Sequence, residues 1–202
     1  MALDRAALEP PHEQAHTSTG VSNVKLAMWV FLSTECLFFG AFISTYLLYR
    51  GRATEGLTPG DVYDIPFTSA TSFILLMSSL TMVLALAAIE RNDIRRTRVW
   101  LLATGCFGLL FLSGQIFEFT EFVREGVAIY SNAPSSAFFV LTGIHGLHVA
   151  IGIIWLLILF AFTLQNRLTH EHSETVEVAG LYWHFVDIVW IVIFVVVYLI
   201  PE

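Results

Sequence analysis

The run from Trp183 to Tyr198 limits the possible folds more than any other stretch, because it is apolar enough to span a membrane and yet carries His184 and Asp187. A carboxylate near the bilayer centre costs about 2.5–3.5 kcal/mol on insertion scales. Roughly a dozen Val, Ile, Leu and Phe residues, at about −0.3 to −0.6 kcal/mol each, outweigh that cost. We therefore predict a transmembrane helix. His184 and Asp187 stand three residues apart on one helical face, which we expect to point into protein.

The composition places the whole chain among membrane proteins with several spans. Of its 202 residues, 56% are hydrophobic and 13% are charged, which excludes an ordinary soluble domain. The net charge of −7 does not suit a nucleic-acid-binding surface. Cys36 and Cys106 lie in apolar runs and show no disulfide or metal-binding spacing. The first apolar run is longer than the core of a signal peptide, so we expect no cleavable signal.

The apolar runs predict an all-α fold, a bundle of five transmembrane helices within residues 23–202. We expect the helices at residues 24–49, 66–90, 99–123, 136–164 and 178–200, after a polar cytoplasmic tail at residues 1–22. The excess of Lys and Arg in alternate connections places the N-terminus inside and the C-terminus outside. The predicted inner segments carry Arg5, Lys25, Arg91, Arg95, Arg96, Arg98 and Arg167, whereas the outer ones carry Arg50, Arg52 and Arg124.

Two further acids inside the predicted helices, Glu35 and Glu118, need an explanation. Glu35 lies about 15 Å beyond Lys25 at the rise of an α-helix, near the bilayer midplane. It has no partner three or four residues away on its own helix. Two interpretations remain open: a neutral, hydrogen-bonded acid, or a group linked to proton movement or to a partner subunit. Glu118 lies nearer a helix end, where we expect it on an acidic surface with Glu121 and Glu125.

The fourth predicted helix adds two titratable groups, because His145 and His148 share one face at a spacing of three. Three interpretations remain open. The histidines could join His184 and Asp187 in a structural network that satisfies buried polar atoms. Two histidines on different helices could instead be the axial ligands of a b-type haem. All four side chains are also types that bind metal or carry protons.

Four stretches recur together in one known family. They are Ser33 to Phe39, Gly114 to Phe119, Thr142 to Val149 and Tyr182 to Trp190. In this combination and order they resemble subunit III of the haem–copper terminal oxidases, in its five-helix bacterial form. The resemblance covers nearly the whole chain from Lys25 onward.

The resemblance implies a subunit of an enzyme complex that has no catalytic residue and binds no metal itself. The haems and the copper of such a complex lie in partner subunits. Subunit III packs directly against subunit I, in a complex that also contains subunit II, and supports the stability of subunit I, proton uptake, and access of lipid and oxygen. The resemblance makes Glu35 the buried acid that faces subunit I. It makes a structural polar network of His145, His148, His184 and Asp187.

The resemblance also implies a location in the bacterial cell membrane and contact with phospholipid. Trp183 and Glu118 are the candidates for contacts with lipid or with a subunit interface. Seven-helix members of the family hold lipid in a cleft formed with two further N-terminal helices. Because this chain has five predicted helices, we expect any lipid to be held against a neighbouring subunit.

Several alternatives stay open. The electron donor of the complex, cytochrome c or quinol, is decided in another subunit. A protein associated with nitric oxide reductase shares these motifs. A self-contained b-type cytochrome and a proton-coupled transporter are less favoured. The chain shows no internal repeat and no matched pair of broken helices of the kind that transporters use.

Overall fold

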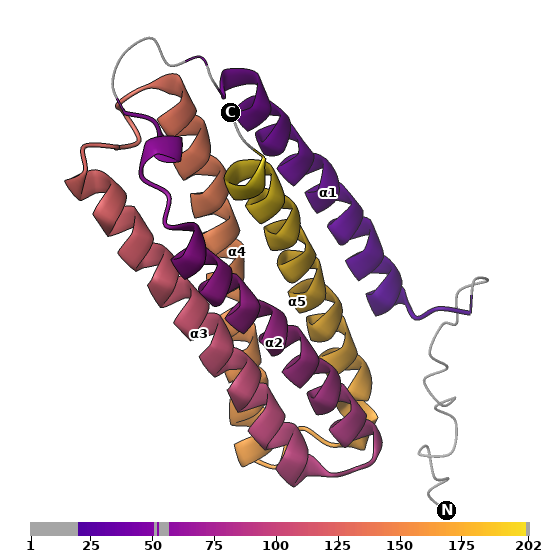
Figure 1. Cartoon of the computed structure of the whole chain (residues 1–202). Coiled ribbons are helices and arrows are strands. Elements are labelled where there is room, and N and C mark those ends of the chain that lie inside the picture. Colours follow the sequence, from indigo (N-terminus) through magenta and orange to yellow (C-terminus); the bar gives the residue numbers. More distant parts are fainter. Residues whose placement is uncertain (1–19, 51, 53–56, 201–202) are drawn as a thin grey trace, which may run out of the picture.

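The computed structural model describes residues 20–50, 52 and 57–200. Of the predicted polar tail at residues 1–22, residues 1–19 lie outside this described part. The described chain consists of long helices joined by short connections (Figure 1). The long helices are α1 (Asn23–Tyr49), α2 (Ile65–Glu90), α3 (Ile94–Arg124), α4 (Ala133–Leu164) and α5 (Ser173–Phe194). Shorter turns are the 3-10 turns Pro59–Asp61 and His170–His172, and the π-helical turn Val195–Leu199 that extends α5.

Five helices of the described part are long and apolar enough to cross a membrane, which confirms the predicted all-α membrane fold. α1 and α2 begin one residue before their predicted starts. α3 and α4 begin several residues early because polar side chains cap them. Asp93 accepts a hydrogen bond from the N–H of Arg96 at 3.0 Å, and Asn132 accepts one from the N–H of Ser135 at 2.8 Å.

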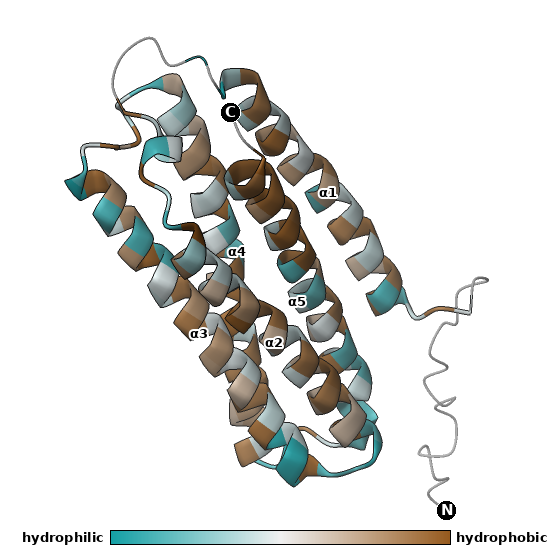
Figure 2. Cartoon of the chain, viewed as in Figure 1, coloured by the Kyte–Doolittle hydropathy of each residue, from teal (hydrophilic) through white to brown (hydrophobic). Residues whose placement is uncertain are grey.

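Helices α2 to α5 form an up-and-down bundle, and α1 lies along its outer edge (Figure 1). α1 packs on α4 and α5, whereas α2 packs mainly on α3 and α5. Each long helix exposes large hydrophobic side chains, and polar residues gather toward the two ends of the bundle (Figure 2). An apolar band between two polar ends matches the hydrocarbon layer and the two interfaces of a bilayer.

α1 contacts the bundle along one narrow stripe. Its buried residues Leu32, Phe39 and Tyr46 are seven positions apart. Glu35 and Phe42 lie between them and are half-buried. A spacing that alternates between four and three residues is the pattern of a coiled-coil seam. One edge of α1 therefore faces the rest of the chain, and Glu35 lies on that edge.

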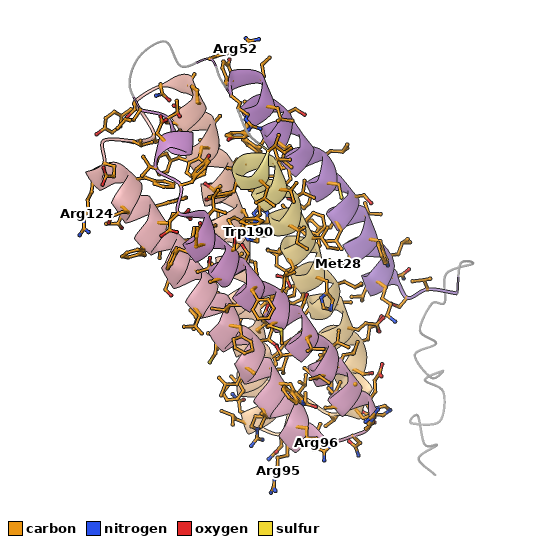
Figure 3. The ribbon with its side chains drawn as sticks, in the orientation of Figure 1. Met28, Arg52, Arg95, Arg96, Arg124 and Trp190 are labelled. Carbon is orange, nitrogen blue, oxygen red and sulfur yellow. The ribbon has the colours of Figure 1, made fainter. Side chains whose placement is uncertain are left out.

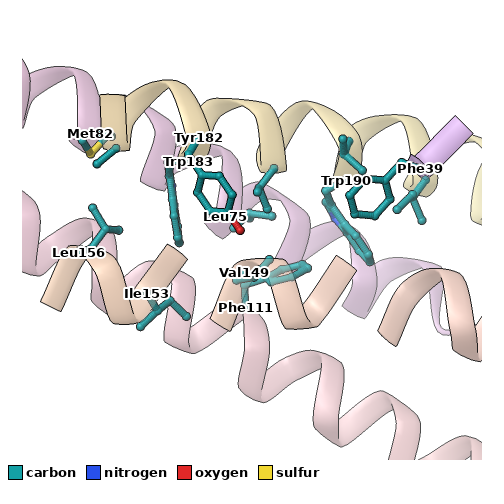
Figure 4. Close-up of a cluster of buried hydrophobic side chains, with 14 of the residues drawn as sticks. Phe39, Leu75, Met82, Phe111, Val149, Ile153, Leu156, Tyr182, Trp183 and Trp190 are labelled. Atoms are coloured by element: carbon teal, nitrogen blue, oxygen red, sulfur yellow. The ribbon is translucent and has the colours of Figure 1, made fainter. Parts of the chain in front are cut away.

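Two buried indoles fill the centre of the bundle (Figure 4). Trp183 lies against Gly108 of α3 and Gly152 of α4, where an added Cβ atom would come within 2.6 and 2.8 Å of the ring. Small residues let the ring approach these helix backbones closely. Trp190 meets Phe111 of α3 edge-on, with ring centroids 4.8 Å apart. These rings link α5 to α3 and α4.

Candidate functional site

The carboxyl group of Glu35 meets the imidazole of His148 between α1 and α4. Glu35 Oε2 lies 3.3 Å from His148 Nε2, and both side chains are mostly buried. This is an ion-pair distance, although the two atoms are not aligned for a hydrogen bond. The ring of Phe39 packs edge-on against the imidazole, with centroids 5.0 Å apart. The acid that lacked a partner on its own helix therefore has one on α4.

The backbone of α4 decides which nitrogen of His148 carries a proton. Nδ1 lies 2.8 Å from the carbonyl oxygen of Ile144, and because a carbonyl accepts only, Nδ1 must donate. Nε2 is then the nitrogen that faces the carboxyl group of Glu35. Pairing two ionisable groups in this way lowers the cost of placing them within a membrane.

Polar contacts also tie the beginning of α1 to the beginning of α5. The Ser22 hydroxyl donates a hydrogen bond to the carboxylate of Glu174. Lys25 Nζ lies 2.7 Å from Glu177 Oε2. Both acids stand in the first turns of α5, and both of their partners stand at the start of α1. The first turns of α1 and α5 therefore lie side by side at this end of the bundle.

Arg50 makes the corresponding attachment at the other end of α1. Its guanidinium group donates hydrogen bonds to the backbone carbonyl of Val196, at 3.2 Å, and to that of Ile200. These carbonyls stand at the C-terminal end of the extended α5, where a helix favours cations. α1 is thus fastened by polar groups at both ends and in the middle, whereas its apolar contact is a single stripe.

His184 and Asp187 meet through a third residue, Ser79 of α2. The Ser79 hydroxyl lies 2.8 Å from His184 Nδ1 and 2.5 Å from Asp187 Oδ2. The hydroxyl can donate to the carboxylate while it accepts from the ring, so one serine serves both groups. Asp187 is 2% exposed, and its Oδ1 has no hydrogen-bond partner among the described residues. This group joins α2 to α5.

His145 belongs to neither of these groups. Its ring is fully buried and stacks on Trp190, with centroids 4.9 Å apart and an angle of 27° between the planes. Neither ring nitrogen has a hydrogen-bond partner in the described part of the chain. The four groups that we expected to form one network are therefore divided, because His148 turns toward α1 whereas His184 and Asp187 turn toward α2.

Glu118 and Trp183 both lie inside the chain, and not on the surfaces where we expected them. Glu118 is 6% exposed and accepts a hydrogen bond of 2.8 Å from the Thr68 hydroxyl. It follows Gln115 by three residues on the buried face of α3, so its position near the helix end does not bring it into water. Trp183 is 1% exposed, and its indole N–H donates to the Ser78 hydroxyl at 2.9 Å.

Comparison with known proteins identifies the family. The family model described as "Cytochrome c oxidase subunit III" matches residues 5–201 of the chain. The chain belongs to this family. The match covers every described helix, so the Glu35–His148 pair and the group around Ser79 both lie within the matched residues.

Curated subunit III proteins are similar to this chain over most of their own length. Cytochrome c oxidase subunit 3 of Alkalihalophilus pseudofirmus is 38% identical over 98% of this chain and 96% of its own. The protein of that name from Bacillus sp. strain PS3 is 37% identical over 88% of this chain and 86% of its own. Quinol oxidase subunit 3 of Bacillus subtilis is 35% identical over 91% of this chain and 89% of its own. These matches confirm the resemblance found in the sequence.

Hydroxyl groups of α2 also belong to the polar contacts of this subunit III chain, and they were not predicted from the sequence. Ser79 binds the two polar groups of α5, and the Ser72 hydroxyl accepts a hydrogen bond of 2.8 Å from the indole N–H of Trp190. Thr68, Ser72 and Ser79 are four and seven residues apart, which places them on one stripe of the helix. The helical spacing of these hydroxyl residues is the sequence signal that could have predicted their contacts.

The intramembrane groups of this subunit III chain can fasten helices and hold protons. His184 Nδ1 bonds to Ser79 of α2, and His148 faces Glu35 of α1. The ring of His145 stacks on Trp190 of α5. Within the residues that the structure describes, no cluster of three or more His, Cys, Asp or Glu side chains has a metal-binding arrangement.

Proposed function

We propose that this chain is the non-redox subunit III of a bacterial haem–copper terminal oxidase, which couples oxygen reduction to proton pumping. In this proposal the partner subunits hold the haems and the copper, and no residue of this chain is catalytic. The observation that carries the proposal is similarity over most of the length, in both directions, to subunit 3 chains of cytochrome c and quinol oxidases. Both oxidase types occur among relatives of similar identity, so either electron donor fits.

Subunit I is the proposed direct partner, and subunit II belongs to the same complex. The peripheral position of α1 supports a neighbour there, because only 11% of an 18-residue apolar stretch of this helix is buried within the chain. Glu35 lies on the edge of α1 that faces α4, so the width of α1 alone would separate Glu35 from a subunit that covers α1. A separation of one helix width supports a proton-linked role for Glu35 beside subunit I.

The proposed orientation places the turn between α2 and α3 on the inner side of the cell membrane. Arg95 and Arg96 lie at this end of the bundle, and Arg52 and Arg124 lie at the other (Figure 3). The first end carries more Lys and Arg in its segments, which favours a cytoplasmic location. The N-terminus is then inside and the C-terminus outside.

Removal of this chain from the oxidase tests the proposed role. We expect the oxidase purified without it to keep the haem absorbance spectrum and to lose activity sooner during turnover. Loss of a haem band together with the chain would contradict a non-redox role. We further expect Glu35→Gln to leave assembly intact and to alter turnover or its decay at high pH. The control is Ser33→Gln on the exposed face of α1, and oxygen consumption and proton stoichiometry that match this control at every pH would refute the role of Glu35.

A further inference from the structure

A cavity of about 560 Å³ opens at the turn between α2 and α3, and its lining includes no residue of the Glu35–His148 pair or of the group around Ser79. Both helices contribute residues at helical spacing, so the cavity is the end of the groove between them. We call it the hairpin groove. It is lined by Leu84, Ala87, Ala88, Arg91, Asp93, Arg95, Arg96, Val99 and Trp100.

The inner wall of the hairpin groove is apolar. Ala87 and Ala88 lie on the α2 side, where their small side chains leave room between the helices. Val99 and Trp100 lie on the α3 side. Trp100 lies in the second turn of α3, beside the polar turn that joins α2 to α3, and Trp favours such positions at a membrane surface.

The rim of the hairpin groove carries unpaired positive charge. Asp93 is the acid in the lining, and its carboxylate is already engaged. Its Oδ1 accepts from the N–H of Arg96, and its Oδ2 lies 3.2 Å from Arg96 Nε. Arg91 and Arg95 are exposed and have no ion-pair partner in the described part of this acidic chain. Two guanidinium groups are therefore available at the rim.

We propose that the hairpin groove binds an anionic phospholipid. Arg91 and Arg95 hold the phosphate with charge-assisted hydrogen bonds. One acyl chain lies along Ala87, Ala88 and Val99, and Trp100 packs beside the glycerol backbone. A net negative head group is required, because the choline of a zwitterionic lipid would cancel the attraction to two arginines. This site depends on the membrane location of the chain and is independent of its role in the oxidase.

The test uses the full chain within its complex, in nanodiscs of equal parts phosphatidylglycerol and phosphatidylcholine. Native mass spectrometry measures which lipid stays bound. We expect wild type to retain phosphatidylglycerol, and the Arg91→Gln/Arg95→Gln variant to lose that preference by about fivefold for each arginine removed. The matched control is Arg52→Gln/Arg124→Gln, which removes two exposed positive charges from the opposite end (Figure 3) and should keep the preference.

A second measurement locates the lipid and separates it from free phosphate. Phosphatidylglycerol with brominated acyl chains should quench tryptophan fluorescence more than brominated phosphatidylcholine. Trp100→Phe and the double arginine variant should each abolish this difference. Retention of inorganic phosphate in place of lipid, equal retention of both lipids by wild type, or equal losses in the two double variants would each overturn the proposal. Circular dichroism spectra with normal helix content show that the variants compared are folded.

Discussion

Glu35 Oε2 lies 3.3 Å from His148 Nε2, and this contact holds the middle of α1 against α4. α1 buries three side chains, all on one stripe. Lipid chains are as apolar as leucine, so such a stripe gains little from leaving lipid, and helix association then depends on close packing and polar contacts. The Glu35–His148 pair therefore helps to hold α1 against the bundle, because the apolar stripe of α1 alone gains little from leaving lipid.

A double-mutant cycle with Glu35→Leu and His148→Phe should give a coupling free energy of about 0.6 kcal/mol and at most about 1.7 kcal/mol, as for other polar contacts between membrane helices. Each single change strands one buried polar partner, whereas the double change strands none. The measurement is the free energy of unfolding in mixed detergent. The control cycle pairs His148→Phe with Ser44→Ala, whose hydroxyl bonds to its own helix. Equal coupling in the two cycles would show that the contact adds nothing.

Ser79→Ala should destabilise the protein by about 1–3 kcal/mol, because it leaves both His184 and Asp187 without their hydrogen bonds. Ser33→Ala removes a hydroxyl that bonds to the backbone on an exposed face of α1, and we expect a change within about 0.5 kcal/mol. Thermal unfolding of both variants in the same detergent provides the comparison. A Ser79→Ala protein as stable as Ser33→Ala would mean that α5 does not depend on this serine.

Gly152→Ala should destabilise the bundle by about 1–3 kcal/mol through overpacking. The new Cβ atom would lie 2.8 Å from the Trp183 ring, and the same ring also lies close to the backbone at Gly108. Gly143→Ala on the same helix meets nothing within 4 Å and should be neutral or slightly stabilising through helix propensity. Melting temperatures measured in parallel distinguish the two, and similar values would argue against a tight fit around Trp183.

Arg50→Gln should loosen the end of α5 without unfolding the bundle. The change removes the cation that donates to the last carbonyls of α5, a contribution of about 0.3–1 kcal/mol at an exposed helix end. Hydrogen exchange should become faster over residues 195–200 and stay unchanged over α3. Unchanged exchange at the end of α5 would mean that water replaces Arg50 without loss.

Much of the fold was predictable because the signal is local. Each apolar run is long enough to span a bilayer by itself, so five helices follow from composition and length. The helix starts were less accurate, because Asp93 and Asn132 cap α3 and α4 outside the apolar runs. The membrane requires apolar residues in each span, but capping decides where a helix begins.

The pairing of polar groups was not predictable, because it depends on how helices rotate against one another. Glu118 lies near a helix end and is nevertheless buried, since the stripe that contains Gln115 turns toward the bundle. His148 and His145 are three residues apart, yet one faces α1 and the other stacks on Trp190. The spacing of residues determines which groups share a helix face, but it does not show which neighbouring helix packs against that face.

The most direct test of the account is purification of the tagged chain from its own membranes in mild detergent, followed by mass spectrometry and an optical spectrum. We predict that a larger, haem-bearing oxidase subunit co-purifies in a fixed ratio, and that the haem absorbance follows that subunit when the complex is split. A chain that purifies stably without such a subunit, or that keeps the haem absorbance after separation, would contradict the account.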